Sequence, residues 1–415
     1  MGCEESDSDV VERVFDNFLK GPKIFINRDA LRPDFIPDRF PHREEQLRRV
    51  AGVVAPVLAG ERGSNLFVYG QTGTGKTAVV RFVLSRLEIR ARSKIRNAST
   101  CYINCRVAGT EYRILASLGK ELGVSVPFTG LATTEVLYRF RKSLEEQKCF
   151  LVVALDEVDT LVKAYGDVLL YHLTRINEGL RGGRLSLIGI SNDLRFKEKL
   201  DPRVLSSLSE EELVFKPYTA PEIRDILLDR AKLAFAEDVL EESALNLCAA
   251  EAASEHGDAR RALDLLRVAG EVAEREGSRK VCDVHVRAAE KKIEEDRVST
   301  VLGSMPLHSK LVLWSSWLAS RAGIEVAATG DLYEVYVELC KESGVEPLTQ
   351  RRISSLINEL DLLGLVNARI VSLGRYGRTK RIKLGVDKAQ LLKVYSEDPW
   401  INPLLSYVPK CLSKS

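Results

Sequence analysis

Residues Gly70 to Thr77 have the types and spacing of a phosphate-binding loop. The run Gly70-Gln71-Thr72-Gly73-Thr74-Gly75-Lys76-Thr77 follows the pattern G-x-x-x-x-G-K-[ST] and continues into Ala78. Glycines let the backbone wrap closely around an anion, so several N–H groups point inward at once. Lys76 supplies a point charge for the β- and γ-phosphates, and Thr77 offers its hydroxyl to Mg²⁺. This stretch therefore predicts a site for ATP or ADP with Mg²⁺.

Two adjacent carboxylates, Asp156 and Glu157, follow the apolar run 150–155. Buried strand ends rarely carry such a pair, because each charge needs compensation. Asp156 would hold Mg²⁺, directly or through water, and Glu157 would polarise the water that attacks a γ-phosphate. We expect this strand to be the sheet neighbour of the strand that enters the phosphate loop. A solvated turn is the alternative.

Three further polar residues have types that suit a triphosphate. Asn192 follows the apolar run 185–190, and an amide there can bridge the attacking water and the γ-phosphate because it both donates and accepts. Arg203 is a candidate arginine finger, reaching a γ-phosphate on a neighbouring subunit or across a cleft. Arg260 follows the helix cap Asp258, where the helix dipole disfavours a cation unless an anion is close. For both arginines an ordinary surface position is the alternative.

The elements that must position these residues alternate between strands and helices. Apolar runs at 66–69, 101–104, 150–155, 185–190 and 213–215 predict a parallel α/β sheet with helices on both faces. Before the sheet, three prolines keep the chain extended, and an amphipathic helix is expected from about 44 to 59. The extended segment is either a linker or one wall of an adenine pocket, with Ile36, Pro37 and Arg43 as nucleotide contacts.

The rest of the chain shows no such alternation. Residues 216–297 have a helical pattern throughout, which predicts a small all-α bundle. Further on, three helices at 309–321, 329–343 and 348–360 precede two strands at 365–372 and 379–384, which is the order of a winged helix. Residues 391–415 are expected to form a tail.

The start of the third of these helices and the tip of the hairpin predict contacts with DNA. A recognition helix turns its N-terminal end toward base edges, and a basic wing suits phosphates and the minor groove. The candidates are Gln350, Arg351, Arg352, Arg375, Tyr376, Gly377, Arg378, Thr379, Lys380 and Arg381. A winged helix that docks proteins is the alternative.

Composition limits the class of protein. The 415 residues carry a net charge of +2, so any DNA-binding surface must be local. No apolar run approaches the about 20 residues of a membrane span. The acidic N-terminus, expected to be flexible over 1–20, is neither a signal nor a transit peptide, and the cysteines lack metal-ligand spacing. These features predict a cytoplasmic, nucleoid-associated protein with no membrane partner.

The order of these motifs resembles the AAA+ ATPases over roughly residues 40–297. With the segments IFINRDALRPDFIP, PHREEQL, LDPRVLSSL, GDARRALDLLR and GRYGRTKRI, the whole chain resembles the archaeal origin-recognition initiators, which are relatives of the eukaryotic origin recognition complex and its helicase-loading partner. The resemblance implies an AAA+ domain at 21–215, an all-α lid at 216–300 and a winged-helix domain at 301–390.

The resemblance also implies a function. Members bind duplex origin DNA under ATP/ADP control and recruit the replicative helicase, with slow hydrolysis acting as a switch. It makes Arg203 the finger and Arg260 the lid sensor, although Arg261 could exchange roles with Arg260. An insertion at about 106–146 would press on the DNA backbone through Phe128, Thr129 and Gly130, with a structural hairpin as the alternative. A second copy or a paralogous initiator is a further implied partner.

Two other classes of protein fit the same motifs. One is a winged-helix AAA+ transcription regulator, which would bind near many promoters and have no helicase partner. The other is a clamp-loader-like assembly ATPase, which would act on a protein and would fail to bind duplex DNA alone. The basic wing argues against the second class.

Overall fold

The structure is a computed structural model that describes residue 15 and residues 23–94, 97–127, 130–208, 210–372 and 378–412. The chain divides into two compact units, Met1–Ala289 and Glu290–Ser415, and each is treated by itself below. Five of the predicted DNA contacts lie outside the described residues: Phe128, Thr129, Arg375, Tyr376 and Gly377. The side chain of Arg378 lies outside them as well.

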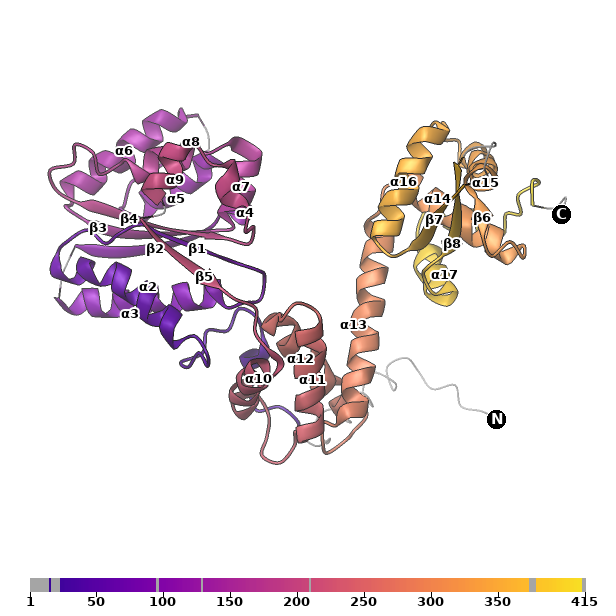
Figure 1. Cartoon of the computed structure of the whole chain (residues 1–415), viewed down its shortest axis with the longest axis horizontal. Helices are drawn as coiled ribbons and strands as arrows, with labels where there is room; N and C mark the ends of the chain where they lie inside the picture. Colours follow the sequence, from indigo (N-terminus) through magenta and orange to yellow (C-terminus); the bar gives the residue numbers. More distant parts are fainter. Residues whose placement is uncertain are drawn as a thin grey trace. The chain divides into compact units, whose positions relative to one another are not determined.

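A five-stranded parallel sheet forms the centre of the first unit, in the order β2-β3-β4-β1-β5 (Figure 1). The strands are β1 (Leu66–Gly70), β2 (Ala98–Asn104), β3 (Phe150–Asp156), β4 (Arg184–Ser191) and β5 (Glu211–Phe215). They confirm the five predicted strands. The expected pairing of the Asp-Glu strand β3 with the loop strand β1 is wrong, because β4 lies between them and pairs with both. Every position of β4 after Arg184 is buried, which suits this central place.

Helices cover both faces of this sheet, because side chains alternate between the two faces along each strand. Leu66 and Val68 pack with α2 (Glu44–Val54), η2 (Ala55–Ala59) and α3 (Lys76–Lys94). Phe67 packs on the other face. The elements there are α4 (Cys105–Ala108), α5 (Glu111–Glu121), α6 (Thr133–Glu146), α7 (Val158–Tyr165), α8 (Val168–Thr174), η3 (Phe196–Lys199) and α9 (Pro202–Leu208).

The first predicted helix is shorter than its pattern suggests. The sequence predicts one helix from 44 to 59, but the α-helix α2 ends at Val54 and a 3-10 turn follows. Pro56 lies at the start of that turn. Proline has no N–H to donate and its ring clashes with the preceding helical turn, so the α-helix ends before it.

A helical lid completes the first unit. It contains α10 (Ala220–Ala234), α11 (Glu242–Ser254), α12 (Ala259–Arg275) and the first residues of α13 (Asp283–Ser304). The N-terminal segment with η1 (Arg28–Leu31) belongs to the same core: Ile24 is fully buried, and the Phe25 ring stacks on Phe235 with 4.9 Å between centroids. The sequence places this segment with the nucleotide-binding domain, whereas its packing is with the lid.

The second unit has the elements of a winged helix. Its helices are α14 (Leu307–Arg321), α15 (Thr329–Glu342) and α16 (Gln350–Leu362), and its antiparallel sheet has the order β6-β8-β7, with β6 (Ala327–Ala328), β7 (Val366–Ser372) and β8 (Arg378–Leu384). The segment predicted to be a tail is folded here. It forms α17 (Lys388–Ser396) and η5 (Asn402–Leu404), and Tyr395 and Ile401 are fully buried in the core of this unit. Within the described residues, no helix has the length and apolarity needed to span a bilayer.

Candidate functional site

The glycine loop joins β1 to α3 and folds back on its own lysine. The Nζ of Lys76 donates to the carbonyl oxygens of Gly70 at 2.8 Å and Gln71 at 2.6 Å. Lys76 is 4% exposed, and burial lowers the pKa of its ammonium to about 8, although the nearby Asp156 carboxylate acts in the opposite direction. The ammonium of Lys76 therefore lies beside the loop, where phosphate oxygens of a bound nucleotide would stabilise its charged form.

Asp156, at the end of β3, is oriented by three donors. Its Oδ2 accepts hydrogen bonds from the Thr77 hydroxyl and the Tyr102 hydroxyl, both at 2.7 Å, and its Oδ1 accepts from the Glu157 backbone N–H at 2.9 Å. Thr77 and Asp156 thus come together from α3 and β3, and they offer hard oxygen ligands that fit Mg²⁺. Asp156 reaches the loop without β3 touching β1, because both strands end at the same edge of the sheet.

Glu157 has an unusual backbone conformation. Its φ of 52° and ψ of 42° lie in the left-handed region, and it is the residue before α7. Residues other than glycine are uncommon there, and such strain is often found at functional sites. The turn separates the directions of the two carboxylates, so that Asp156 is buried against Thr77 while Glu157 remains partly exposed.

The lid helix α12 begins directly on the glycine loop. Asp258 caps it by accepting from the backbone N–H of Arg260 at 2.8 Å, and the Ala259 N–H donates to Gly73 O at 3.3 Å. A Cβ placed on Gly73 would lie 1.7 Å from Asp258 Oδ1, so glycine is required at this contact. Arg260 lines the pocket beside the loop, whereas Arg261 is paired with Glu255 and is not among the lining residues.

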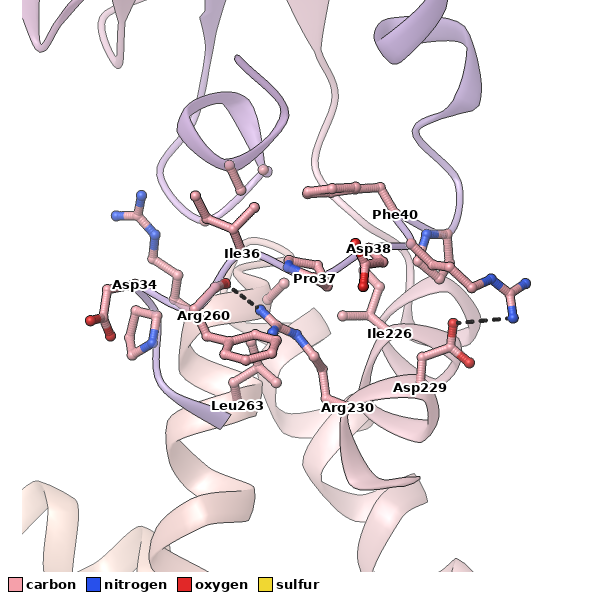
Figure 2. A pocket seen from close by; sticks show the side chains of 18 of the residues that line it. Asp34, Ile36, Pro37, Asp38, Phe40, Ile226, Asp229, Arg230, Arg260 and Leu263 are labelled. Atoms are coloured by element: carbon pink, nitrogen blue, oxygen red, sulfur yellow. Dashed lines mark hydrogen bonds and ion pairs between the residues drawn. The ribbon is translucent and has the colours of Figure 1, made fainter. Parts of the chain in front are cut away.

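The pocket between the loop and the lid has a volume of about 450 Å³. Gly73, Gly75, Thr77 and Ala78 form its loop end. The apolar end comes from residues 33–41, which we call the strap, and from the lid; Figure 2 shows Ile36, Pro37, Phe40, Ile226 and Leu263 around it. The loop end beside Arg260 suits phosphates and these apolar side chains suit a base, although Asp34, Asp38, Arg39, Asp229 and Lys232 also line the pocket. The predicted wall residues Ile36 and Pro37 do line the pocket.

Other predicted contacts lie near the pocket but outside its lining. Arg43 is buried behind the loop, where its guanidinium donates to Thr74 O at 3.1 Å and Lys216 O at 2.7 Å and lies 3.8 Å from the Tyr218 ring centroid. Arg43 thus joins the loop to the connection that enters the lid, and because it does not line the pocket, its role as a nucleotide contact stays a prediction. Gln71 and Thr72 have exposed side chains, and Thr74 is fully buried.

Of the two remaining predicted catalytic residues, Asn192 lies at the sheet edge near Asp156, whereas Arg203 lies outside the pocket lining. Asn192 directly follows β4, and its backbone N–H donates to Asp159 Oδ1 at 3.3 Å, which fixes the turn at the same sheet edge as Asp156. Arg203 lies exposed on α9 and does not line this pocket. Of the two alternatives for Arg203, action on another subunit fits this placement better than action within the chain.

The winged-helix unit presents the start of α16 next to the wing strands. Gln350, Arg351, Thr379 and Lys380 line one hollow of about 650 Å³. Gln350, Arg351 and Arg352 are exposed, as is Arg381, and Arg352 approaches Glu359 at 3.7 Å.

Lys380 differs from these residues. Its Nζ donates to Ser354 O and Oγ, both at 2.9 Å, and to Asn358 Oδ1 at 2.7 Å. All three of its donors are thus used on α16, which braces the wing against that helix, and the contact of Lys380 with DNA stays a prediction. Burial also lowers the pKa of Lys380.

The insertion between β2 and β3 contains α5 and α6, which its pattern predicts, and the short helix α4, which was not predicted. Of its three predicted DNA contacts only Gly130 is described; it is exposed, with φ of 103°, and it lies in the loop between α5 and α6. The Tyr112 hydroxyl donates to Pro127 O at 2.5 Å and ties one end of that loop to α5.

Sequence reasoning did not single out several residues near the glycine loop, among them Tyr218 and Arg230, which line the pocket, and Tyr102, which donates to Asp156. Signals for two of them exist in the sequence. Tyr102 alternates with the buried Cys101 and Ile103, so strand periodicity turns it to the face that carries α3. Arg230 interrupts the apolar stripe of α10 that contains Ile223 and Leu227, which is an unusual place for a cation.

Three family models match the chain in the order of its domains. The AAA domain covers residues 60–197, the Cdc6 AAA+ ATPase-type lid domain covers 224–291, and the CDC6 C-terminal winged helix domain covers 300–394. The chain is 49% identical over 404 residues to the ORC1-type DNA replication protein of Thermococcus onnurineus, which spans 96% of this chain and 97% of that protein. The chain belongs to the ORC1-type DNA replication protein family.

Other relatives of this ORC1-type protein agree. The Pyrococcus furiosus ORC1-type DNA replication protein is 51% identical over 400 residues, 95% of each chain. The structure of the Aeropyrum pernix ORC1 protein in complex with DNA is 50% identical, with a TM-score of 0.80, and covers 92% of this chain and 99% of that one. Cdc6p from Pyrobaculum aerophilum is 25% identical, with a TM-score of 0.59, and covers 89% and 98%. The AAA+ core, the lid and the winged helix predicted from the sequence are thereby confirmed.

Proposed function

We propose that this ORC1-type protein is an ATP-dependent initiator of DNA replication that binds duplex origin DNA. One observation carries the proposal: a single chain joins a nucleotide pocket closed by a lid to a winged helix whose exposed face is basic. A 50% identical relative is the Aeropyrum pernix ORC1 protein in complex with DNA, which supports DNA binding by this chain.

In the proposed nucleotide complex, Lys76 contacts the β- and γ-phosphates, and the loop N–H groups hold them. Thr77 and Asp156 would hold Mg²⁺, which neutralises charge on the phosphates. Glu157 orients and deprotonates the attacking water, and Asn192 bridges that water and the γ-phosphate. Arg260 reaches the phosphates from the lid, which accounts for a cation at the start of α12, where the helix dipole disfavours one.

The proposed activity is slow hydrolysis used as a switch. Arg260 and Asp258 lie at the start of one lid helix, so contact with a γ-phosphate would alter how the lid rests on Gly73. Arg203 lies outside the pocket of its own chain, so its role as a finger would require a second copy or a paralogous initiator. A lone chain would therefore turn over slowly.

The proposed DNA contacts come from two places. Gln350 and Arg351 at the start of α16 would face base edges, and the wing would contact phosphates. The insertion would add backbone contacts near Gly130. Recruitment of the replicative helicase rests on family resemblance alone, and no surface of the described chain is assigned to it.

The decisive experiment maps the chromosomal sites occupied by the tagged chain in its own cells. Initiation predicts one or a few sites that coincide with replication start regions. Occupancy of many promoters would support the transcription-regulator alternative instead. Failure of the purified chain to bind any duplex DNA would favour the assembly-ATPase alternative.

The switch is tested separately with Glu157→Gln. Removing the general base while retaining the size of the side chain should leave ATP bound but unhydrolysed. Nucleotide content and DNA footprints are measured for the variant and the wild type. Identical footprints with ATP and ADP in both proteins would contradict the switch.

A further inference from the structure

Arg230, on α10, is a buried cation in the wall of the nucleotide pocket, and only 7% of the residue is exposed. Its Nη2 donates to Phe35 O at 3.0 Å, the hydrogen bond drawn as the dashed line from Arg230 in Figure 2. Its guanidinium lies 4.7 Å from the centroid of the Phe35 ring. Its Nη1 has less than 1 Å² of exposed surface and no hydrogen-bond partner within the described chain.

The charge of Arg230 has no compensating carboxylate among the described residues. The neighbouring Asp229 is engaged elsewhere, 4.0 Å from an Arg39 nitrogen and 3.9 Å from the Lys232 nitrogen. Burial lowers the pKa of Arg230 to about 10, so the side chain still carries its charge at pH 7. A buried cation with an unmade hydrogen bond is costly to keep. A ligand that supplies an acceptor would relieve that cost on binding.

The position of Arg230 indicates which part of a nucleotide supplies the acceptor. The phosphates belong at the loop end, beside Lys76 and Arg260. Arg230 is bound to the strap, at the end where Ile36 and Leu263 provide flat apolar surface. That end suits a planar purine, whose ring nitrogens are its hydrogen-bond acceptors, and it offers little to a phosphate.

We propose that Arg230 is a specificity-determining residue that donates from Nη1 to a ring nitrogen of the purine base. The proposal rests on the proposed nucleotide function and deepens it. The ring of Phe35 covers one face of the guanidinium, so base entry is accompanied by a shift of Phe35 within the strap. Arg230 then couples the lid, the strap and the base in one contact.

The test measures calorimetric binding of the full-length chain to ATP and to 1-deaza-, 3-deaza- and 7-deaza-ATP. Each analogue replaces one ring nitrogen by CH and leaves the shape of the base unchanged. In the wild type, one analogue should bind about tenfold more weakly than ATP, because a hydrogen bond from a charged donor is lost. Equal binding of all four nucleotides by the wild type would overturn the proposal, whatever any variant does.

The variant arm uses Arg230→Met, which keeps the apolar stem and removes the donors. It should bind ATP about tenfold more weakly than the wild type and should bind ATP and the sensitive analogue equally. Arg230→Lys, which keeps the charge and a donor, should retain part of the discrimination. A variant that still discriminates among the analogues like the wild type would show that Arg230 only supports Phe35.

Inorganic tripolyphosphate and 2′-deoxy-ATP are the control ligands. Tripolyphosphate has no base, so the wild type and Arg230→Met should bind it equally. If Arg230→Met loses as much affinity for tripolyphosphate as for ATP, base recognition by Arg230 is overturned. If the wild type binds 2′-deoxy-ATP more weakly than ATP but binds every deaza analogue as tightly as ATP, the contact is with the ribose and the proposal is overturned. If the wild type binds neither nucleotide nor tripolyphosphate, the proposed function itself fails, which is a distinguishable result.

Discussion

The nucleotide pocket and the DNA-facing surface of the winged helix are built in opposite ways. The pocket gathers the strap, the glycine loop and the start of α12, which are far apart in the sequence. Beside the loop, Lys76 and Asp156 are each only 4% exposed. The winged-helix candidates lie within residues 350–381, and of the six whose side chains are described, Gln350, Arg351, Arg352 and Arg381 are exposed.

This difference teaches what to expect from substitutions. Beside the loop, the charges of Asp156 and Asp258 act on Lys76, and the effects of substituting residues that interact in this way are not additive. On the winged helix, exposed cations such as Arg351 and Arg381 would act separately on the duplex in the proposed complex, so their effects should add. A single substitution in the nucleotide pocket should therefore abolish most of the nucleotide binding. Each substitution on the winged helix should reduce DNA affinity by a similar, additive amount.

The largest expected effect is that of Lys76→Ala. It removes the one lysine of the glycine loop, so ATP affinity should fall at least about a hundredfold, the equivalent of two lost charged hydrogen bonds. Calorimetric titration with ATP provides the measurement. Lys120→Ala removes an exposed lysine of α5 and should leave affinity unchanged. Comparable losses in both variants would mean that the loop lysine has no special role.

Gly73→Ala should have the next largest effect. A Cβ would meet Asp258 Oδ1 at 1.7 Å, and φ of 71° disfavours alanine, so the lid must move off the loop. We expect a stability loss of about 2 kcal/mol, seen as a lower melting temperature, together with weaker ATP binding. Gly52→Ala is the matched control, because nothing lies within 4 Å of its Cβ and it is in helix α2. An unchanged melting temperature for Gly73→Ala would contradict the lid contact.

Arg351→Ala should weaken duplex binding about tenfold, the loss of one good base or phosphate contact. If the contact is with phosphate, the slope of the logarithm of the binding constant against the logarithm of the salt concentration should become shallower by about one unit. Fluorescence anisotropy over a salt series measures both quantities. Lys380→Met is the informative comparison, since its ammonium is tied to α16: it should destabilise the winged helix and leave the salt slope unchanged. A reduced slope for Lys380→Met would show that the lysine does contact DNA.

The smallest expected effect is a pH dependence. The pKa of Lys76 is lowered from 10.5 to about 8 in the free chain, so above pH 8 binding must recapture a proton and ATP affinity should fall several-fold by pH 9. The folded free chain then binds fewer protons than the unfolded chain between about pH 8 and 10.5, so this group's contribution to stability rises with pH in that window. Titrations from pH 7 to 9 check the first effect. Lys76→Ala should lack it.

The sequence by itself determined the parts that depend on neighbouring residues. The glycine loop, the Asp156-Glu157 pair, the five strands and the helices of lid and winged helix follow from local spacing and periodicity. Such patterns are visible because a loop, a strand or a helix is specified by contiguous residues. The family resemblance rests on the same contiguous motifs, and for that reason it held across the whole chain.

Only the tertiary structure decided which side chains meet. It inserted β4 between β3 and β1, packed residues 24–31 into the lid, and turned Arg260 rather than Arg261 toward the pocket. It also gave three basic residues different partners, which their sequence positions did not reveal. Arg43 donates to the glycine loop, Lys380 donates to α16, and Arg230 donates to the strap. A charge in the sequence states what a residue can bind, but its partner is set by packing between distant segments.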